Sequence, residues 1–277
     1  MNLIDVHCHL THAQFKADLV QVLKRAEQAG VKAILVSGVN PPANREVLEL
    51  VSKYPQILRA SLGVYPIDAL GKADAETGLP QQIVPIDLDD EFKFLEKNKD
   101  NFIAIGEIGL DFYWVKKEET YEKQADNFRR IIRFAKKLNK PIVIHSRKAE
   151  AESVQILKEE IPNKEIPVIQ HCFSGNKSTI REAAALDHYF SIPPNIVKSH
   201  NFQTLVKIVD INQLLTETDA PWLGPVAGER NEPANVLESV KKIAEIKGLT
   251  VEEAAERIWE NYQKIFGVDV AFLKANI

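Results

Sequence analysis

The sequence predicts a (β/α)8 barrel, the α/β fold in which eight parallel strands alternate with helices. Two observations predict it. Short β-rich runs alternate with longer amphipathic helical patterns from one end of the chain to the other, which is typical of parallel βα units. The chain has 277 residues, and eight units of about 30 residues each account for nearly all of them.

The expected strands are short and mostly apolar. They cover residues 3–7, 33–37, 57–63, 102–107, 141–145, 166–171, 188–192 and 213–217. The expected helices have apolar residues at three- and four-residue spacings. They cover residues 15–29, 43–53, 87–98, 119–138, 149–161, 176–186, 200–209 and 233–247. A further helix at 250–265 and a short tail at 266–277 predict a helical C-terminal extension, from about 250 to 277, on a single domain spanning 1–277.

The connection from the third strand to the next helix is unusually long. Residues 64–86 are rich in Gly, Pro and Asp and contain no expected element. Loops of this length are often functional, and a loop that follows a barrel strand lies on the face where barrel active sites are found. The segment is therefore either a surface insertion or a cover over the substrate.

Composition limits the possible functions. A hydrophobic content of 45% is enough for a large core, and a net charge of −4 argues against broad binding of duplex nucleic acid. A small site that grips a few phosphates is compatible with that charge. The two cysteines, Cys8 and Cys172, form no CxxC pattern, so no disulfide framework is expected. No secretion signal and no apolar stretch of about 18 residues is found, so we expect a cytoplasmic protein without a membrane segment.

Two histidines stand at the end of the first expected strand, in the run Ile4-Asp5-Val6-His7-Cys8-His9-Leu10. Alternate side chains of a strand share a face, so His7 and His9 should point together and Cys8 away from them. Two neutral imidazoles that converge in this way form half of a metal site.

Four more residues of metal-ligating types stand at the ends of later strands. They are Glu107, His145, His171 and Asp219. A barrel brings these strand ends close together, which predicts a pocket of four imidazoles and two carboxylates. Six ligands are too many for one tetrahedral zinc and fit two divalent ions that share a carboxylate.

We assign His7, His9, Glu107 and Asp219 to one ion and Glu107, His145 and His171 to the other. Glu107 is the expected bridge. Asp219 is the candidate to orient a water molecule and accept its proton, with simple metal ligation as the alternative.

Carboxylates behind the ligands are expected to orient the imidazoles. The candidates are Asp5, Asp111 and Glu217, of which Glu217 could instead belong to a buried ion pair. Arg147 follows His145 by two residues and is the best candidate to grip a phosphate, since a guanidinium can bind it through two hydrogen bonds. Arg230 is a weaker candidate. Trp114 could stack an unpaired base or pack against the barrel rim.

These stretches resemble the TatD-type deoxyribonucleases, a branch of the metal-dependent amidohydrolase-like barrels. The matching motifs are IDVHCHL, GEIGLDFYW, PIVIHSRKAE, QHCFSG, TETDAPWL and RNEPANV. The resemblance implies a (β/α)8 barrel, a divalent metal site at the matching positions, and hydrolysis of DNA phosphodiesters, often from the 3′ end. The chain departs from the family pattern at Thr11, usually Asp, and at Tyr65, usually a histidine near the substrate. The Tyr65 hydroxyl could replace a hydrogen bond of that histidine.

The leading hypothesis is a deoxyribonuclease that uses two divalent ions (Mg²⁺, Mn²⁺ or Zn²⁺) to cleave DNA from single-stranded or frayed ends, in the 3′–5′ direction. The alternative is an amidohydrolase-type enzyme that hydrolyses a small lactone, amide or phosphoester on the same barrel. A binding protein with a vestigial site is a third possibility, against which the complete ligand set argues.

Overall fold

The computed structural model describes residues 1–72 and 78–267 of the chain. Within them, eight strands lie where the sequence predicts strands, and all neighbouring pairs are parallel. The strands are β1 (Leu3–Cys8), β2 (Val31–Ser37), β3 (Leu58–Ser61), β4 (Ile105–Gly109), β5 (Ile142–His145), β6 (Val168–Gln170), β7 (Tyr189–Ile192) and β8 (Leu214–Thr216). The predicted alternation of strands and helices is confirmed.

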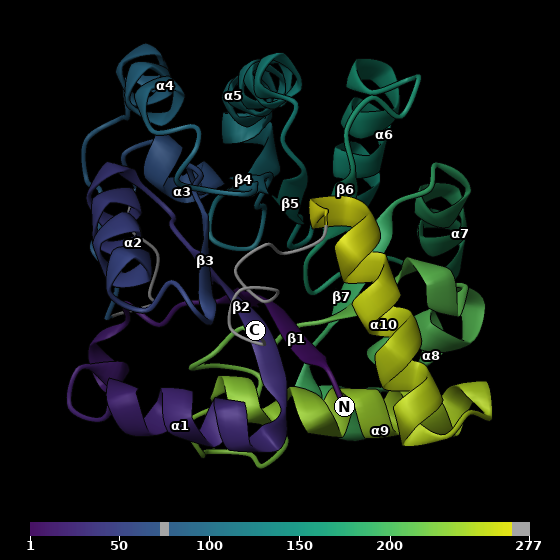
Figure 1. Ribbon diagram of the computed structural model, residues 1–277. Helices are drawn as coiled ribbons and strands as arrows, with labels where there is room; N and C mark the ends of the chain where they lie inside the picture. The colour runs from purple at the N-terminus through teal and green to yellow at the C-terminus, as the bar shows by residue number, and fades with distance from the viewer. Residues whose placement is uncertain (73–77, 268–277) are drawn as a thin grey trace.

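Helices connect successive strands and surround them (Figure 1). The α-helices are α1 (Leu19–Ala29), α2 (Pro41–Lys53), α3 (Pro66–Ala69), α4 (Leu88–Lys97), α5 (Lys117–Leu138), α6 (Glu150–Glu160), α7 (Lys177–Ala185), α8 (His200–Ile208), α9 (Val236–Lys247) and α10 (Val251–Phe266). Four short 3-10 turns are η1 (Ala13–Phe15), η2 (Pro194–Val197), η3 (Ile211–Gln213) and η4 (Pro233–Asn235). None of the helices in the described ranges combines the length and apolar character needed to cross a bilayer.

The strands pair in two groups, β1 to β3 and β4 to β8, and backbone contacts join the groups at both seams. Between β3 and β4, Ser61 and Ala104 form a parallel bridge. Between β8 and β1, the Asp219 amide donates to the His7 carbonyl oxygen over 2.9 Å. The strands are thereby arranged around one axis as a (β/α)8 barrel, which confirms the predicted fold class.

The strands are buried over almost their whole length, because helices cover their outer side and strand side chains fill the barrel. This burial explains why the strands appear in the sequence as nearly continuous apolar runs. The exceptions are polar residues in or just after the strands, such as Ser37, Glu107 and His171, which are buried even so. A buried polar side chain needs a partner, and these residues find theirs in one cluster.

The expected helix at 15–29 is divided into η1 and α1, so its predicted start is wrong. Asp18 precedes α1, but its side chain makes no capping hydrogen bond to the helix. Its two carboxylate oxygens instead accept bonds of 2.8 and 2.7 Å from the guanidinium of Arg230. A contact with a distant loop thus occupies the group that would otherwise cap the helix.

The long segment 64–86 contains the short helix α3, which was not expected. Pro66 stands in its first turn, where a missing amide hydrogen has no cost. Beyond residues 73–77, which lie outside the described residues, the segment is tied to the barrel. The Asn40 side-chain amide donates to the Pro80 carbonyl oxygen over 2.6 Å, and the Ala13 amide donates to that of Gly78 over 2.9 Å. Residues 78–80 are thus fixed against the loops that follow β1 and β2.

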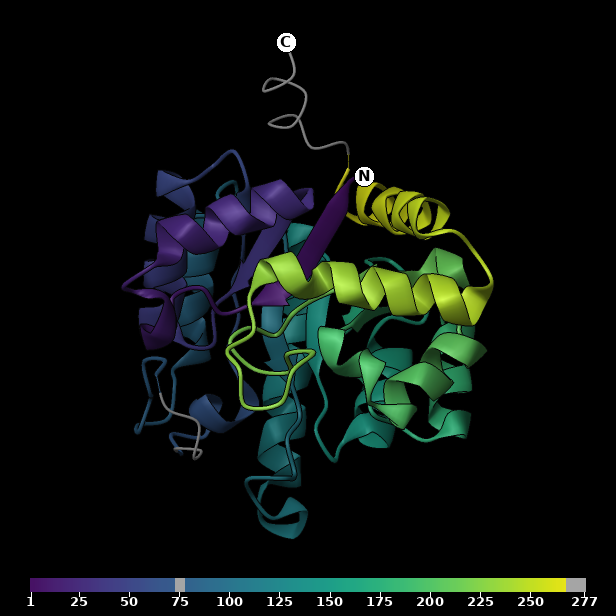
Figure 2. The same cartoon turned by 90° about the horizontal axis from the view of Figure 1, so that it is seen from below.

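The C-terminal helix α10 begins with a capping box formed by Thr250 and Glu253. The Asn261 side-chain amide donates to the carbonyl oxygens of Ile211 and Leu214, each over 2.8 Å. The helix therefore packs beside the start of β8, and α9 lies next to it (Figure 2). The expected extension is found as far as residue 267, and the remainder of the expected tail lies outside the described residues.

Candidate metal centre

His7 and His9 point to the same side of the barrel end, as the two-residue period predicts. Their Nε2 atoms lie 3.2 Å apart, and both rings are buried. Cys8 points the other way, and its thiol donates to the Leu35 carbonyl oxygen over 3.5 Å. The strand thus directs two imidazoles and no sulfur into the barrel.

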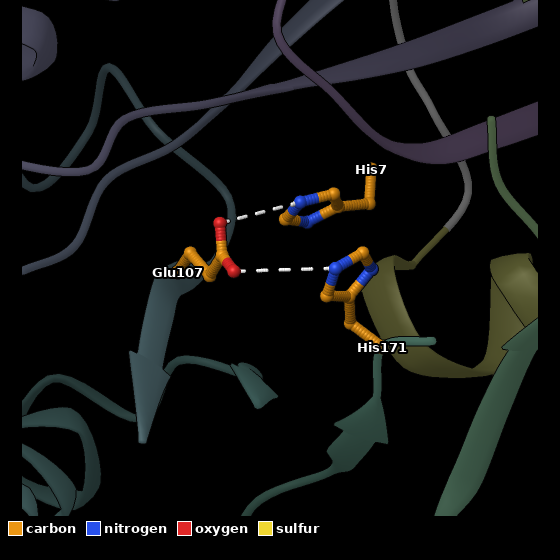
Figure 3. Close-up of side chains that lie close together, drawn as sticks. All are labelled: His7, Glu107 and His171. Atoms are coloured by element: carbon orange, nitrogen blue, oxygen red, sulfur yellow. Dashed lines mark ion pairs between the residues drawn. The ribbon is translucent and has the colours of Figure 1, made fainter. Parts of the chain in front are cut away.

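Glu107 lies between two pairs of histidines. Its Oε2 atom is 3.5 Å from Nε2 of His7 and 3.6 Å from Nε2 of His9. Its Oε1 atom is 2.7 Å from Nδ1 of His145 and 4.0 Å from Nε2 of His171. Figure 3 shows the carboxylate facing His7 with one oxygen and His171 with the other. Each oxygen therefore serves a different histidine pair.

Asp219 reaches the same cluster from the loop after β8. Its Oδ1 atom lies 3.6, 3.5 and 3.9 Å from the Nε2 atoms of His7, His9 and His171. Its backbone has φ +53°, a left-handed conformation that Asp adopts more readily than most residues. The structure therefore brings together all six residues that the sequence analysis assigned to the metals.

The imidazole nitrogens that face away from the cluster have different partners. Nδ1 of His7 lies 3.0 Å from the Ser37 hydroxyl oxygen. Nε2 of His145 is 2.8 Å from Asp111, and Nδ1 of His171 is 2.7 Å from Glu217. In the described residues, Nδ1 of His9 is buried without a hydrogen-bond partner.

Two of the three predicted supporting carboxylates therefore contact a ligand imidazole, and the third does not. Asp5 accepts hydrogen bonds from the His7 amide over 3.2 Å and the Thr218 amide over 2.9 Å. It joins the end of β1 to the loop that contains Asp219. Asp5 therefore contacts the backbone of His7, whereas the His7 ring has Ser37 as its partner.

The sequence analysis missed Ser37 and Asn231. Ser37 is the polar last residue of the apolar run in β2, and that position was the available signal. The fully buried Asn231 side-chain amide donates to the Thr218 carbonyl oxygen over 2.8 Å, which fixes the Asp219 loop. Asn231 stands in the RNEPANV motif, but the motif alone does not reveal this contact, because the partner lies 13 residues earlier.

The electrostatics of the cluster favour positive charge at its centre. Burial alone would raise the pKa of Glu107, but its contacts with His145 and His7 hold that pKa well below the usual value. Burial would lower the pKa of both His145 and His171. Asp111 and Glu107 raise that of His145 to about 9, and Glu217 with Asp219 raises that of His171 to about 10. The positive charge is supplied either by protons or by metal cations.

The donor atoms around Glu107 Oε2 fit a divalent ion. The nitrogens of His7 and His9 and the oxygens of Glu107 and Asp219 are 3.2 to 3.6 Å apart in five pairs. Donors about 2.1 Å from a common ion would be separated by about 3.0 to 3.4 Å. The donors around Oε1, from His145 and His171, are spread less evenly, at 2.7 and 4.0 Å from that oxygen.

A cavity of about 460 Å³ opens directly above this cluster. Its polar wall includes the predicted residues Tyr65 and Arg147, and residues 79–81 of the long segment form another side. Apolar and aromatic side chains complete it, among them Val39, Phe202 and Trp222. The long segment thus lies on the active-site face, where its position after β3 predicts it.

Two predicted substrate-binding residues lie away from the cavity wall. Arg230 is bonded to Asp18 and, over 2.6 Å, to the Gln14 carbonyl oxygen, so its guanidinium joins two loops. Trp114 packs beside Tyr65, and its ring centroid is 5.3 Å from Cζ of Arg147. The Arg230 guanidinium is thus engaged in an ion pair with Asp18, and its contact with substrate stays a prediction, while Trp114 packs against the rim.

The fold and the donor set define a metal-dependent hydrolase built on a (β/α)8 barrel. The family model described as TatD related DNase matches residues 4–267, and the chain belongs to that family. It is 35% identical to human deoxyribonuclease TATDN3, over 96% of this chain and 95% of that protein. It is 32% identical to the uncharacterized metal-dependent hydrolase YabD of Bacillus subtilis, over 96% of this chain and all of that protein. The crystal structure of YjjV, a TatD homolog from Escherichia coli, superposes with a TM-score of 0.83 at 25% identity, covering 96% of this chain and 98% of YjjV.

Proposed function

We propose that the protein hydrolyses DNA phosphodiester bonds from an end, using two divalent ions that Glu107 bridges. The observation that supports this most is the position of Glu107, whose two oxygens face different histidine pairs below one cavity. His7, His9 and Asp219 would hold one ion, and His145 and His171 the other. Mg²⁺, Mn²⁺ and Zn²⁺ are all compatible with these ligands. When bound, the ions would polarise a phosphoryl oxygen and lower the pKa of a water molecule.

Asp219 is the proposed proton acceptor. It is part of the cavity wall, and its Oδ1 atom lies 3.5 to 3.9 Å from the Nε2 atoms of His7, His9 and His171. Burial would raise its pKa, but His9 and the neighbouring imidazoles lower it, so the carboxylate is ionised at neutral pH. An ionised carboxylate beside the reacting water can orient it and accept its proton.

Substrate contacts are proposed for Arg147 and Tyr65. Arg147 is a cation on the cavity wall and would grip a phosphate of the DNA backbone. Tyr65 is 9% exposed, and its hydroxyl donates to Asp111 over 3.1 Å. Its ring lies edge-on to His145, with centroids 4.9 Å apart. Tyr65 would therefore contact the substrate through its ring while its hydroxyl supports Asp111.

The size of the cavity supports cleavage from an end. A volume of about 460 Å³ is in the range of small-molecule sites, roughly 300 to 1,000 Å³, which suits one nucleotide unit rather than a duplex. Residues 79–81 limit the cavity on one side, so a terminal or frayed single strand is the proposed substrate. The 3′–5′ direction follows from the family resemblance. The similarity to human deoxyribonuclease TATDN3 supports DNA as the polymer.

A second candidate is hydrolysis of a small amide, lactone or phosphoester. The apolar part of the cavity wall, with Val39, Leu79 and Phe202, favours it, as does the net charge of −4. The two candidates share the metal ligands, and a small amide or lactone would differ from DNA in having no need for Arg147, since only a phosphate-bearing substrate requires a cation on the wall.

The test is release of nucleotides from single-stranded DNA labelled at either end. The protein supplied with Mg²⁺ or Mn²⁺ is compared with chelated protein, with Glu107→Ala and with the exposed matched control Glu122→Ala. We expect metal-dependent release from the 3′ end by the wild type and by Glu122→Ala only. No release by a protein shown to contain metal would reject the deoxyribonuclease. Turnover of a small amide, lactone or phosphoester by that same protein would then establish the second candidate.

A further inference from the structure

The half-exposed side chain of Tyr113 lies against Arg147, a residue of the cavity wall, and has no role in the mechanism proposed above. It is 51% exposed, in the loop that follows β4. Cζ of Arg147 lies 3.7 Å from the centroid of its ring, which is the arrangement of a cation–π contact. An exposed aromatic ring costs free energy in water, so one that stacks on the proposed phosphate grip calls for an explanation.

The loop that contains Tyr113 is built around Asp111. The Oδ1 atom of Asp111 accepts hydrogen bonds from the amides of Tyr113, over 2.8 Å, and Trp114, over 3.0 Å. Its Oδ2 atom faces the metal-ligand candidate His145 at 2.8 Å. Gln124 fixes the Asp111 backbone through two hydrogen bonds of 2.8 Å. One fully buried carboxylate therefore sets the positions of both the aromatic loop and a ligand imidazole.

The loop that contains Arg147 is joined to the same block. The Phe112 amide donates to the Arg147 carbonyl oxygen over 3.0 Å, and the Leu110 amide donates to that of His145 over 3.1 Å. The loops after β4 and β5 thus continue the pairing of their strands. Because both backbones are fixed, the position of the guanidinium depends on the long Arg147 side chain, whose Cζ lies 3.7 Å from the Tyr113 ring centroid and 5.3 Å from that of Trp114.

We infer that Tyr113 is a positioning residue that holds the Arg147 guanidinium at a fixed distance from the metal centre, where it meets a phosphate of the substrate. This inference rests on the proposed function to the extent that the substrate carries phosphate. An unrestrained arginine loses conformational entropy when it binds, and the stacked ring removes that cost beforehand. Arg147 covers one face of the Tyr113 ring, so a base cannot stack on that face. We therefore expect the ring to act on substrate binding through the arginine.

A double-mutant cycle tests this by binding alone. The probe is a fluorescent oligothymidylate whose anisotropy is measured in the presence of a chelator, so that cleavage is not required. The variants are Tyr113→Leu, Arg147→Met, their combination, and the conservative Tyr113→Phe. The exposed Arg257→Met is the matched control. We expect Tyr113→Leu to weaken binding about threefold to thirtyfold and Tyr113→Phe to bind like the wild type. The double variant should bind no more weakly than Arg147→Met.

Independent effects of the two substitutions would overturn the inference, as would unchanged binding by Tyr113→Leu. The same measurement with an abasic deoxyribose-phosphate oligomer separates the roles of the ring. Loss of binding by Tyr113→Leu on both probes supports positioning of Arg147, and loss on the base-containing probe only would show base stacking instead. Absence of binding by the wild type would overturn the inference together with the phosphate grip. Binding without cleavage would reject only the proposed reaction.

Discussion

The two halves of the candidate metal centre are supported in different ways. In the first half, around Oε2 of Glu107, His7 is backed by a hydroxyl group and His9 by no described residue. In the second half, around Oε1, His145 and His171 are each backed by a buried carboxylate. A carboxylate behind an imidazole fixes its tautomer and increases its basicity. The first half instead gains a second direct carboxylate, from Asp219.

The two halves thus hold their additional negative charge in different places. In the first half the additional carboxylate, Asp219, lies among the donor atoms. In the second half the carboxylates of Asp111 and Glu217 lie behind the imidazoles. The two arrangements respond differently to substitution and to pH, so each of the following predictions addresses one half or the residue that both halves share.

The largest effect is expected at the shared residue. Glu107→Ala removes a donor from both halves at once and should lower turnover by at least about a thousandfold. Saturating metal should not restore it. Metal content after dialysis should fall in the same variant, and circular dichroism checks that the barrel is folded. Full turnover with retained metal would contradict the bridging role.

Removing a supporting charge should act mainly on the second half. Glu217→Gln and Asp111→Asn should each weaken metal binding about 10- to 100-fold, measured by competition with a chromogenic chelator. Because the donor atoms remain, activity should return at high metal concentration. An affinity equal to that of the wild type would show that the charge of these carboxylates has no influence on the metal.

Competition between protons and metal ions for the imidazole nitrogens should also be strongest in the second half. The pKa values of about 9 for His145 and about 10 for His171 lie above the usual value, so both imidazoles are protonated at neutral pH in chelated protein. Metal binding must displace these protons, so metal affinity should increase about tenfold or more per pH unit from about pH 6 to about pH 8. Calorimetry in buffers of different ionisation enthalpy measures the protons released, and release of none would contradict the prediction.

The same raised pKa values predict that chelated protein becomes less stable as the pH rises, whereas its metal affinity increases. A group whose pKa is raised by folding stabilises the fold fully below its unfolded value, near 6.5. That contribution is lost as the pH rises through about 9 to 10. The free energy of unfolding of chelated protein should therefore decrease over this range, as measured by denaturant titration, while metal-loaded protein should show a smaller change.

A smaller effect is expected from Ser37→Ala in the first half. A neutral hydroxyl orients His7 without increasing its basicity as a carboxylate would, so metal affinity should fall by less than about tenfold. The chelator competition used for the second half measures it directly. A loss as large as that of Glu217→Gln would remove the proposed distinction between the two halves.

The smallest effect is expected outside both halves. Arg230→Ala should lower the free energy of unfolding by about 0.5 to 1 kcal/mol, because it breaks a partly exposed ion pair with Asp18. Its KM for DNA should equal that of the wild type, as steady-state kinetics would show. A raised KM would restore the substrate contact that the sequence suggested.

The strand ends could be predicted from the sequence, and the contacts between loops could not. His7, His9 and His145 were identified because a parallel barrel places every strand end on one face, a rule that needs only the strand pattern. The ion pair of Arg230 could not be predicted, because its partner Asp18 lies 212 residues away and no periodicity records such a pair. Asn231 was missed for the same reason. The charged residues of loops are positioned by tertiary contacts, which a one-dimensional pattern does not contain.

The measurement that tests the central claim most directly is anomalous diffraction from crystals of the wild-type protein soaked with Mn²⁺. We expect two anomalous peaks, one on each side of the Glu107 carboxylate, the first beside His7 and His9 and the second beside His145 and His171. A single peak that contacts all four imidazoles, or a peak away from Glu107, would contradict a centre in which this residue bridges two ions.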